Sequence, residues 1–307
     1  MQIIRDGKAD GAKKAVALGN FDGLHRAHIK IIKTCCQYAE ENGLESSVLL
    51  FCEHTVNVIT GSKIKLLTNE TEKLEILDAM GVDCVYIREF DADLMHLSPE
   101  EFVLMLIDKL NISAVCVGYD YRFGYKAEGD VKTLKKLGEK YGFRVIVTDE
   151  MKTSGVTIKS TKIRELVCEG KVDDASLFLG RPFSVTGEVT KGLRNGHKLG
   201  TPTANVCYGD NKLLPKEGVY MGHTTVCGVR YDSVINVGSN PTFDAKKITV
   251  ESHILGFDGD IYGKTVKVEF VKRIRGDRKF DSLDALKAQI KSDIETAKEQ
   301  LHRGVEK

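Results

Sequence analysis

The order of expected strands and helices changes once along this chain, near Gly180 and Arg181, and this change restricts the fold more than any other feature. Before it, apolar runs that predict strands alternate with amphipathic stretches that predict helices. The expected strands are 15–18, 47–51, 82–87, 114–117 and 143–147, and the expected helices are 28–41, 70–80, one beginning at Ser98, and 131–141. After it, strands are expected in direct succession over 183–190, 219–226, 233–236, 248–254 and 265–271, followed by a helix over 282–300. The sequence therefore predicts two domains, residues 1–180 and 181–307.

Each half of the pattern favours one architecture. Strands separated by single helices favour an α/β fold with a doubly wound parallel sheet, whose ligands bind at the carboxyl ends of the strands. Strands joined by turns rich in Gly, Asp and Asn predict an antiparallel β-barrel or sandwich. The final helix closes this second domain, and we expect it to pack through the face that carries Leu283, Leu286, Ile290 and Ile294.

Charge and cysteine usage exclude several classes of partner. The chain has 45 Lys and Arg against 44 Asp and Glu, a net charge of +1, so no field of the whole chain attracts nucleic acid or an anionic membrane. No uncharged apolar stretch is long enough to span a bilayer, and the start of the chain does not have the form of a secretory signal. None of the eight cysteines is spaced as CxxC, which argues against a zinc ribbon and favours reduced thiols in the cytoplasm.

The first motif runs from Gly19 to His28, directly after an expected strand and into an expected helix. Its glycines permit a tight turn, and a helix N-terminus presents free N–H groups to an anion. His25, Arg26 and His28 add groups that can bind phosphate oxygens. Three interpretations remain open from the residues alone: a phosphate site, a glycine turn with surface histidines, and an HxxH metal pair without a third ligand.

This segment resembles the HxGH signature of nucleotidylyltransferases, in the form G-x-F-D-G-x-H-x-G-H of bacterial bifunctional riboflavin kinase/FAD synthetases. Similar segments follow in the same order, at 67–68 with 72–73, 97–102, 117–124 and 129–130, and 160–164 resembles the motif S-T-x-I-R. The resemblance implies a nucleotidylyltransferase-like fold for the first domain, with His25, His28 and Arg164 as catalytic residues. It also implies ATP or substrate binding by Gly19, Asn20, Phe21, Gly23, His54, Asp120, Ser160 and Thr161.

The chain departs from that family at three places. Ala27 stands where the family has glycine, and Lys159 replaces a common serine. The segment Phe51–Thr55 stands where F-E-P-H-P is usual, and it keeps only Phe51 and His54 of that motif. These departures motivate one alternative, a riboflavin kinase whose first domain has lost adenylylation. Adenylyl transfer needs positioning and charge neutralisation, not a protein nucleophile, so the retained His25 and His28 favour an active site.

The second motif contains Gly187, Lys191, Gly192, Gly196 and Gly200, followed by Pro202-Thr203-Ala204-Asn205. Glycine-rich turns can surround phosphates with backbone N–H groups. The Thr203 hydroxyl and the Asn205 carbonyl are hard oxygen ligands of the kind that Mg²⁺ accepts beside ATP. A plain glycine-rich hairpin is the alternative, and the sequence contains neither a Walker A motif nor GxGxxG.

This run resembles G-x-P-T-A-N of riboflavin kinases, and further similar segments lie at 214–215, 218–220, 236–238, 241–243, 251–253 and 257–263. The resemblance implies ATP binding by Gly187, Lys191, Gly192 and Gly200, and binding of Mg²⁺ by Thr203 and Asn205. Glu251 falls at the position of the catalytic carboxylate, and a strand glutamate there can take the proton of an alcohol. Arg275 falls in a stretch that resembles the flavin-side loop.

The resemblance therefore implies a cytoplasmic transferase with two activities. The second domain would phosphorylate riboflavin with Mg-ATP to give FMN and ADP, and the first would join FMN to AMP from ATP, giving FAD and pyrophosphate. A binding protein that responds to flavin or nucleotide without turnover is the alternative from another class. Glu251 argues against it, because binding alone does not need a base. The oligomeric state cannot be predicted from the sequence.

Overall fold

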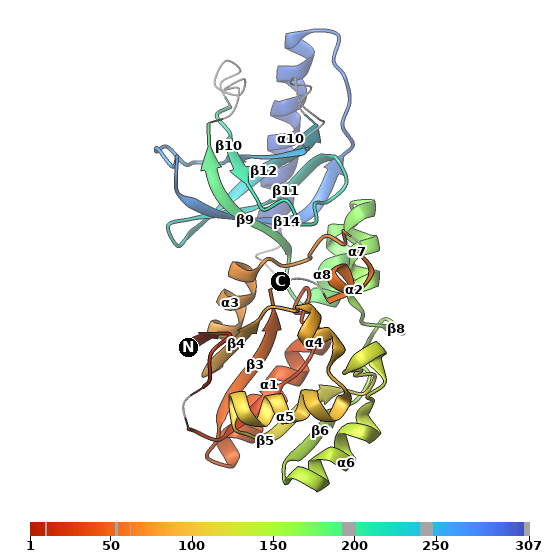
Figure 1. Cartoon of the computed structure of the whole chain (residues 1–307). Helices are drawn as coiled ribbons and strands as arrows, with labels where there is room; N and C mark the ends of the chain where they lie inside the picture. Colours follow the sequence, from red (N-terminus) through yellow and green to blue (C-terminus); the bar gives the residue numbers. More distant parts are fainter. Residues whose placement is uncertain (10, 53–54, 62, 192–200, 240–247, 304–307) are drawn as a thin grey trace. The chain divides into compact units, whose positions relative to one another are not determined.

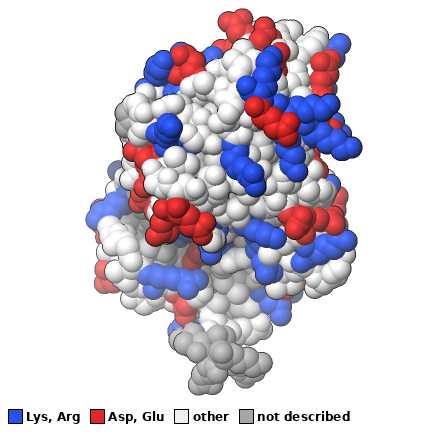
Figure 2. Space-filling model, turned by 90° about the horizontal axis from the view of Figure 1, so that it is seen from below, with Lys and Arg blue, Asp and Glu red and all other residues white. Residues whose placement is uncertain are grey.

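The structure is a computed structural model that describes residues 1–9, 11–52, 55–61, 63–191, 201–239 and 248–303 (Figure 1). Contacts between Cα atoms divide the chain into two compact units, Met1–Ser160 and Thr161–Lys307. Within the described residues, no helix is both long and apolar enough to cross a membrane. On the face drawn in Figure 2, basic and acidic side chains are interspersed.

The first unit contains a six-stranded parallel sheet in the order β1-β4-β3-β2-β5-β6, which confirms the predicted doubly wound α/β fold. The strands are β1 Gln2–Arg5, β2 Lys14–Ala17, β3 Glu45–Phe51, β4 Cys84–Arg88, β5 Ile112–Gly118 and β6 Arg144–Thr148. β1 was not expected from the sequence. Strand order reverses between β2 and β5, so the carboxyl ends of these two strands form the switch point where ligands bind in such sheets.

Helices cover both faces of this sheet, because alternate residues of the central strands are apolar on each face. α1 (Arg26–Glu41) and α3 (Glu70–Ala79) pack against one face, and α5 (Pro99–Leu110) and α6 (Val131–Tyr141) against the other. Ser98 caps α5 with a reciprocal capping box to Glu101, as the Ser-Pro-Glu-Glu pattern predicts. The shorter elements are α2 Thr55–Thr60, α4 Ala92–His96, a 3₁₀ turn at Tyr125–Ala127, and the hairpin of β7 Lys152–Thr153 and β8 Val156–Thr157.

The second unit is a closed six-stranded antiparallel barrel in the order β10-β13-β12-β11-β14-β9, so of the two predicted architectures the barrel is confirmed (Figure 1). Its strands are β9 Phe183–Thr190, β10 Ala204–Cys207, β11 Gly218–Val226, β12 Val229–Ser239, β13 Ile248–Ile254 and β14 Thr265–Arg275. β10 was expected only as a turn. Gly187 has no room for a side chain, because a Cβ there would lie 2.1 Å from the Cys207 carbonyl oxygen on β10.

The last helix, α10 (Leu283–Arg303), packs on the outside of the barrel through Ala297 and Leu301. The predicted apolar face is wrong at its start, because the first leucine, Leu283, is 68% exposed. The packed face is shifted toward the end of the helix, and it includes the buried carboxylate of Asp293.

Two short helices, α7 (Ser160–Glu169) and α8 (Val172–Leu179), precede the barrel. α8 packs against β14 and β9, and the Gly170 turn between the helices leaves little space beside Arg273 and Tyr220. These helices therefore belong to the second compact unit although they lie before residue 181. The boundary between the two activities, placed between residues 180 and 181, stays a prediction.

Candidate functional site

The first candidate site is the loop that joins β2 to α1, at the switch point of the sheet. His25 is the N-cap of α1, and its Nδ1 accepts the backbone N–H of His28 at 3.3 Å. The two imidazole rings are stacked with centroids 3.6 Å apart. Because Nδ1 of His25 acts as an acceptor, its proton in the neutral ring lies on Nε2, where it can be donated to a ligand.

His28 lies in a site of low polarity. The Phe21 ring, which is fully buried, meets His28 edge-on at 5.3 Å. Burial, with the positive potential of His25 and Lys73, holds the pKa of His28 well below its ordinary value of 6.5. Its Nδ1 is buried and has no hydrogen-bond partner in the described part of the chain. The loop thus brings two imidazoles together, and the ring nitrogen Nδ1 of one of them, His28, is buried without a hydrogen-bond partner among the described residues.

Asp22 fixes the shape of this loop. Its buried carboxylate accepts the backbone N–H groups of Leu67 at 2.9 Å and Thr68 at 3.3 Å. Gly23, at φ +85°, donates its own N–H to the Thr68 hydroxyl at 3.0 Å. The Gly23 N–H is therefore bound within the protein and is not offered to a phosphate. Gly23 can serve the predicted phosphate site only by allowing the tight turn, since its positive φ suits glycine.

One further predicted residue of the first site, Ser160, contacts this loop directly. Ser160 begins α7 and donates its hydroxyl to the Asp22 carbonyl oxygen at 2.9 Å, which joins the S-T-x-I-R motif to the loop. Thr161 and Arg164 follow on α7. Asn20 is exposed and accepts a hydrogen bond from Thr55 at 3.1 Å.

Two other predicted positions, Gly19 and Asp120, follow the carboxyl ends of β2 and β5. A Cβ at Gly19 would lie 3.2 Å from the Phe21 ring. Asp120 is exposed and lies 3.6 Å from Lys159, the residue that replaces a serine of the family. His54 lies outside the described residues.

The second candidate site is a row of polar residues across the outer face of the barrel. Register pairs one residue from each of four neighbouring strands, which we call the polar row: Thr190, Asn205, Glu251 and Asn236. Directly opposed residues share one face of a sheet, and the alternate positions, such as Val206 and Val250, fill the barrel interior. The barrel thus places Glu251 between two side-chain amides.

Two more groups extend the polar row. Thr203, directly before β10, is half-buried, and the preceding Pro202 carbonyl contacts Nδ1 of His253 at 2.8 Å. His253 and Asn236 were not among the predicted site residues, although both lie in segments that resemble the kinase motifs. Within the described part, no cluster of three or more His, Cys, Asp or Glu residues could hold a metal ion. The hard oxygens of Thr203 and Asn205 nevertheless fit Mg²⁺, which keeps few protein ligands beside phosphates.

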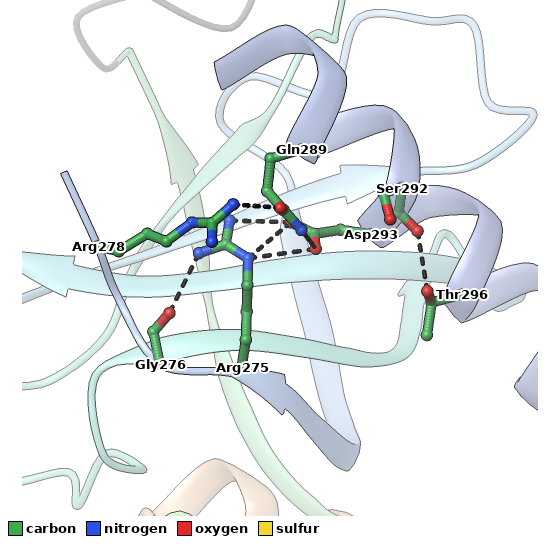
Figure 3. Close-up of polar contacts among 7 residues, drawn as sticks. All are labelled: Arg275, Gly276, Arg278, Gln289, Ser292, Asp293 and Thr296. Carbon is green, nitrogen blue, oxygen red and sulfur yellow. Dashed lines mark hydrogen bonds and ion pairs between the residues drawn. The ribbon is translucent and has the colours of Figure 1, made fainter. Parts of the chain in front are cut away.

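Arg275, predicted on the flavin side, is held by α10 (Figure 3). Its Nη2 donates to Asp293 at 2.9 Å and its Nε lies 3.1 and 3.2 Å from the two carboxylate oxygens. Its Nη1 donates to the Gly276 carbonyl, and its guanidinium lies 5.6 Å from the Phe280 ring. Lys191 is exposed just beyond β9, and Gly192 and Gly200 lie outside the described residues.

Comparisons with known proteins match the two parts of the chain to two different families. The FAD synthetase family matches residues 8–162, and the riboflavin kinase family matches residues 179–301. A solved structure described as a macrolide-efflux protein from Streptococcus pneumoniae covers 97% of this chain and 99% of that chain, with 30% identity and a TM-score of 0.89.

Curated relatives extend over nearly the whole chain. The bifunctional riboflavin kinase/FMN adenylyltransferase of Listeria monocytogenes is 34% identical, over 91% of this chain and 90% of that protein. The proteins of the same name are 33% identical over 94% of this chain in Bacillus subtilis and 34% identical over 92% in Escherichia coli K12, and they are covered over 93% and 91% of their own lengths. The chain belongs to the bifunctional riboflavin kinase/FMN adenylyltransferase family.

Proposed function

We propose that this protein converts riboflavin to FAD in two steps. The barrel transfers the γ-phosphate of ATP to the terminal hydroxyl of riboflavin, which gives FMN and ADP. The α/β unit then transfers AMP from a second ATP to the FMN phosphate, which gives FAD and pyrophosphate. The observation that carries the proposal is the polar row, because it places a carboxylate between amides on a barrel next to the G-x-P-T-A-N segment.

In the kinase step, the Glu251 carboxylate accepts the proton of the attacking hydroxyl as the new P–O bond forms. Asn205 and Asn236 flank Glu251 across the sheet and can orient that hydroxyl or the phosphate. Thr203 and Asn205 would hold Mg²⁺, which neutralises charge on the transferred phosphoryl group.

In the adenylyl step, an oxygen of the FMN phosphate attacks the α-phosphorus of ATP and pyrophosphate departs, without a covalent bond to the protein. His25 donates a hydrogen bond from Nε2 to a phosphate oxygen. His28 donates another from whichever ring nitrogen carries its proton, Nδ1 or Nε2. Both bonds stabilise the charge that develops on the phosphate oxygens. Ser160 is bonded to the Asp22 carbonyl oxygen, and the S-T-x-I-R motif that it begins supplies Thr161 and Arg164 as further phosphate ligands by its resemblance to the family.

The eight cysteines, all within the described residues, have free thiols, which supports the cytoplasm as the place of action. The test is to incubate the protein with riboflavin, ATP and Mg²⁺ and to separate the three flavins by chromatography, with Mg²⁺ omitted as the control. We expect FMN first and FAD later. FMN without FAD would support the alternative with an inactive first domain, and unchanged riboflavin would contradict the proposal.

A further inference from the structure

Lys73, in the second turn of α3, is a buried lysine that the roles assigned above do not use. It is 6% exposed. The other buried lysines have partners: Lys14 lies 2.6 Å from Glu45, and Lys212 lies over the Phe183 ring at 4.9 Å. No described residue places an oxygen within ion-pair distance of Lys73 Nζ. The stem of Lys73 is buried, but Nζ is not among the side-chain atoms that are both sealed from solvent and without a hydrogen-bond partner, so a ligand can reach the ammonium group.

The negative charge of Asp22 does not by itself explain why a lysine is buried at position 73. The Asp22 carboxylate already accepts two backbone N–H groups, from Leu67 and Thr68. Burial lowers the pKa of Lys73, and the neighbouring carboxylates of Asp22 and Glu70 oppose this effect without cancelling it.

The position of Lys73 indicates what can compensate it. α3 follows directly on the segment that is bound to the β2–α1 loop through Asp22 and Thr68. The ammonium group is close enough to His28 to contribute to the lowering of its pKa. Nδ1 of His28 is itself buried and without a hydrogen-bond partner among the described residues. A buried cation and an unsatisfied imidazole nitrogen therefore occur together beside the predicted phosphate loop.

We propose that Lys73 is a further phosphate-binding residue of the first site, whose Nζ donates to a phosphate oxygen of ATP or of FMN. The assignment rests on the adenylyltransferase function proposed above. An ammonium group on a buried stem has few positions open to it, so a charge-assisted hydrogen bond from Nζ to a phosphate oxygen also positions the anion.

The test compares Lys73→Met, which keeps the length and apolar character of the side chain, with the matched control Lys14→Met. FAD formation from FMN is measured while ATP and FMN are varied separately, and FMN formation from riboflavin by the same samples is the internal reference. Loss of a hydrogen bond to a charged group predicts that Lys73→Met weakens FAD formation by about 10–100-fold. A rise in KM for ATP identifies ATP as the source of the phosphate, and a rise for FMN identifies FMN.

Thermal stability separates binding from a structural role. Lys73→Met keeps the buried stem and removes a charge that forms no ion pair within the described part of the chain, so we expect a melting temperature equal to or above that of the wild type, whereas Lys14→Met leaves Glu45 unpaired and lowers it. Wild-type FAD formation by Lys73→Met would overturn the assignment. So would lost activity together with a lowered melting temperature, because that result assigns Lys73 to the fold.

A failure of the proposed function is recognised separately. If the wild type forms FMN but no FAD, the adenylyltransferase function fails, and calorimetric titration with pyrophosphate then decides the role of Lys73. Binding weakened at least about tenfold by Lys73→Met supports the phosphate role, and unchanged binding or no binding overturns it.

Discussion

The ion pair between Arg275 and Asp293 connects the end of β14 to α10, and Asp293→Asn tests how much it stabilises the second unit. The carboxylate of Asp293 receives the guanidinium group of Arg275 and also the side-chain amide of Gln289 at 2.7 Å (Figure 3). Arg278 donates in turn to Gln289. The substitution keeps the shape of the side chain and removes its charge.

Removing one partner of a fully buried ion pair costs about 3–5 kcal/mol. Asp293 is near that limit, since its side chain is 4% exposed, but the Arg275 side chain is 19% exposed and can be partly hydrated after the change. We therefore expect a smaller loss than for a fully buried pair, with the free energy of unfolding lower by about 2–3 kcal/mol. In a unit of this size that loss corresponds to a melting temperature lower by roughly 6–9 °C.

Differential scanning calorimetry of the full chain measures the effect, with Glu295→Gln as the control because Glu295 is exposed on the same helix. The control should stay within about 0.5 kcal/mol of the wild type. The double variant Arg275→Met/Asp293→Leu should recover most of the loss, since it leaves no unpaired charge. If Asp293→Asn melts together with the wild type, the ion pair does not stabilise this unit and the reasoning fails.

Three further predictions concern the two activities. Glu251→Gln should lower FMN formation by about 10²–10⁴-fold in a quenched assay while riboflavin binding, measured by fluorescence, is unchanged; full activity would exclude Glu251 as the base. A fragment of residues 161–307 should make FMN without FAD. A shorter fragment of residues 183–307 should melt at a lower temperature than the first fragment, measured by circular dichroism, because it lacks the contacts of α8 with β9 and β14. Equal melting temperatures of the two fragments would show that α8 is dispensable. Ala27→Gly should leave FAD formation nearly unchanged and cost up to about 1 kcal/mol of stability in urea, and FAD formation that appears only in this variant would show that alanine impairs the site.

The sequence predicts the main strands and the two architectures because one apolar period dominates each segment. It does not predict β10, because Pro202 and the small polar residues after it are typical of a turn, and only pairing with β9 and β13 makes the segment a strand. The polar row could not be predicted from the sequence either, because Asn205 and Glu251 lie far apart in the chain and only the register between β10 and β13 places them side by side. The burial of Asp293 and Lys73 was not predicted, because a prediction from apolar periodicity places every charged residue on the exposed face of its helix.

Of the departures from the family motifs, Thr55 and Lys159 contact the predicted site residues Asn20 and Asp120, whereas Ala27 takes no part in the hydrogen bonds that hold the β2–α1 loop. Asp22 joins three segments: its carboxylate binds the residues before α3, its carbonyl oxygen binds Ser160 of α7, and the residue itself lies in the β2–α1 loop. A separate bond, from the His28 N–H to Nδ1 of His25, holds the histidine pair, and the Ala27 side chain has no part in any of these contacts. A methyl group at position 27 therefore changes the surface of the first turn of α1 and leaves the framework of the site intact. This is the structural reason to expect that the first unit forms FAD.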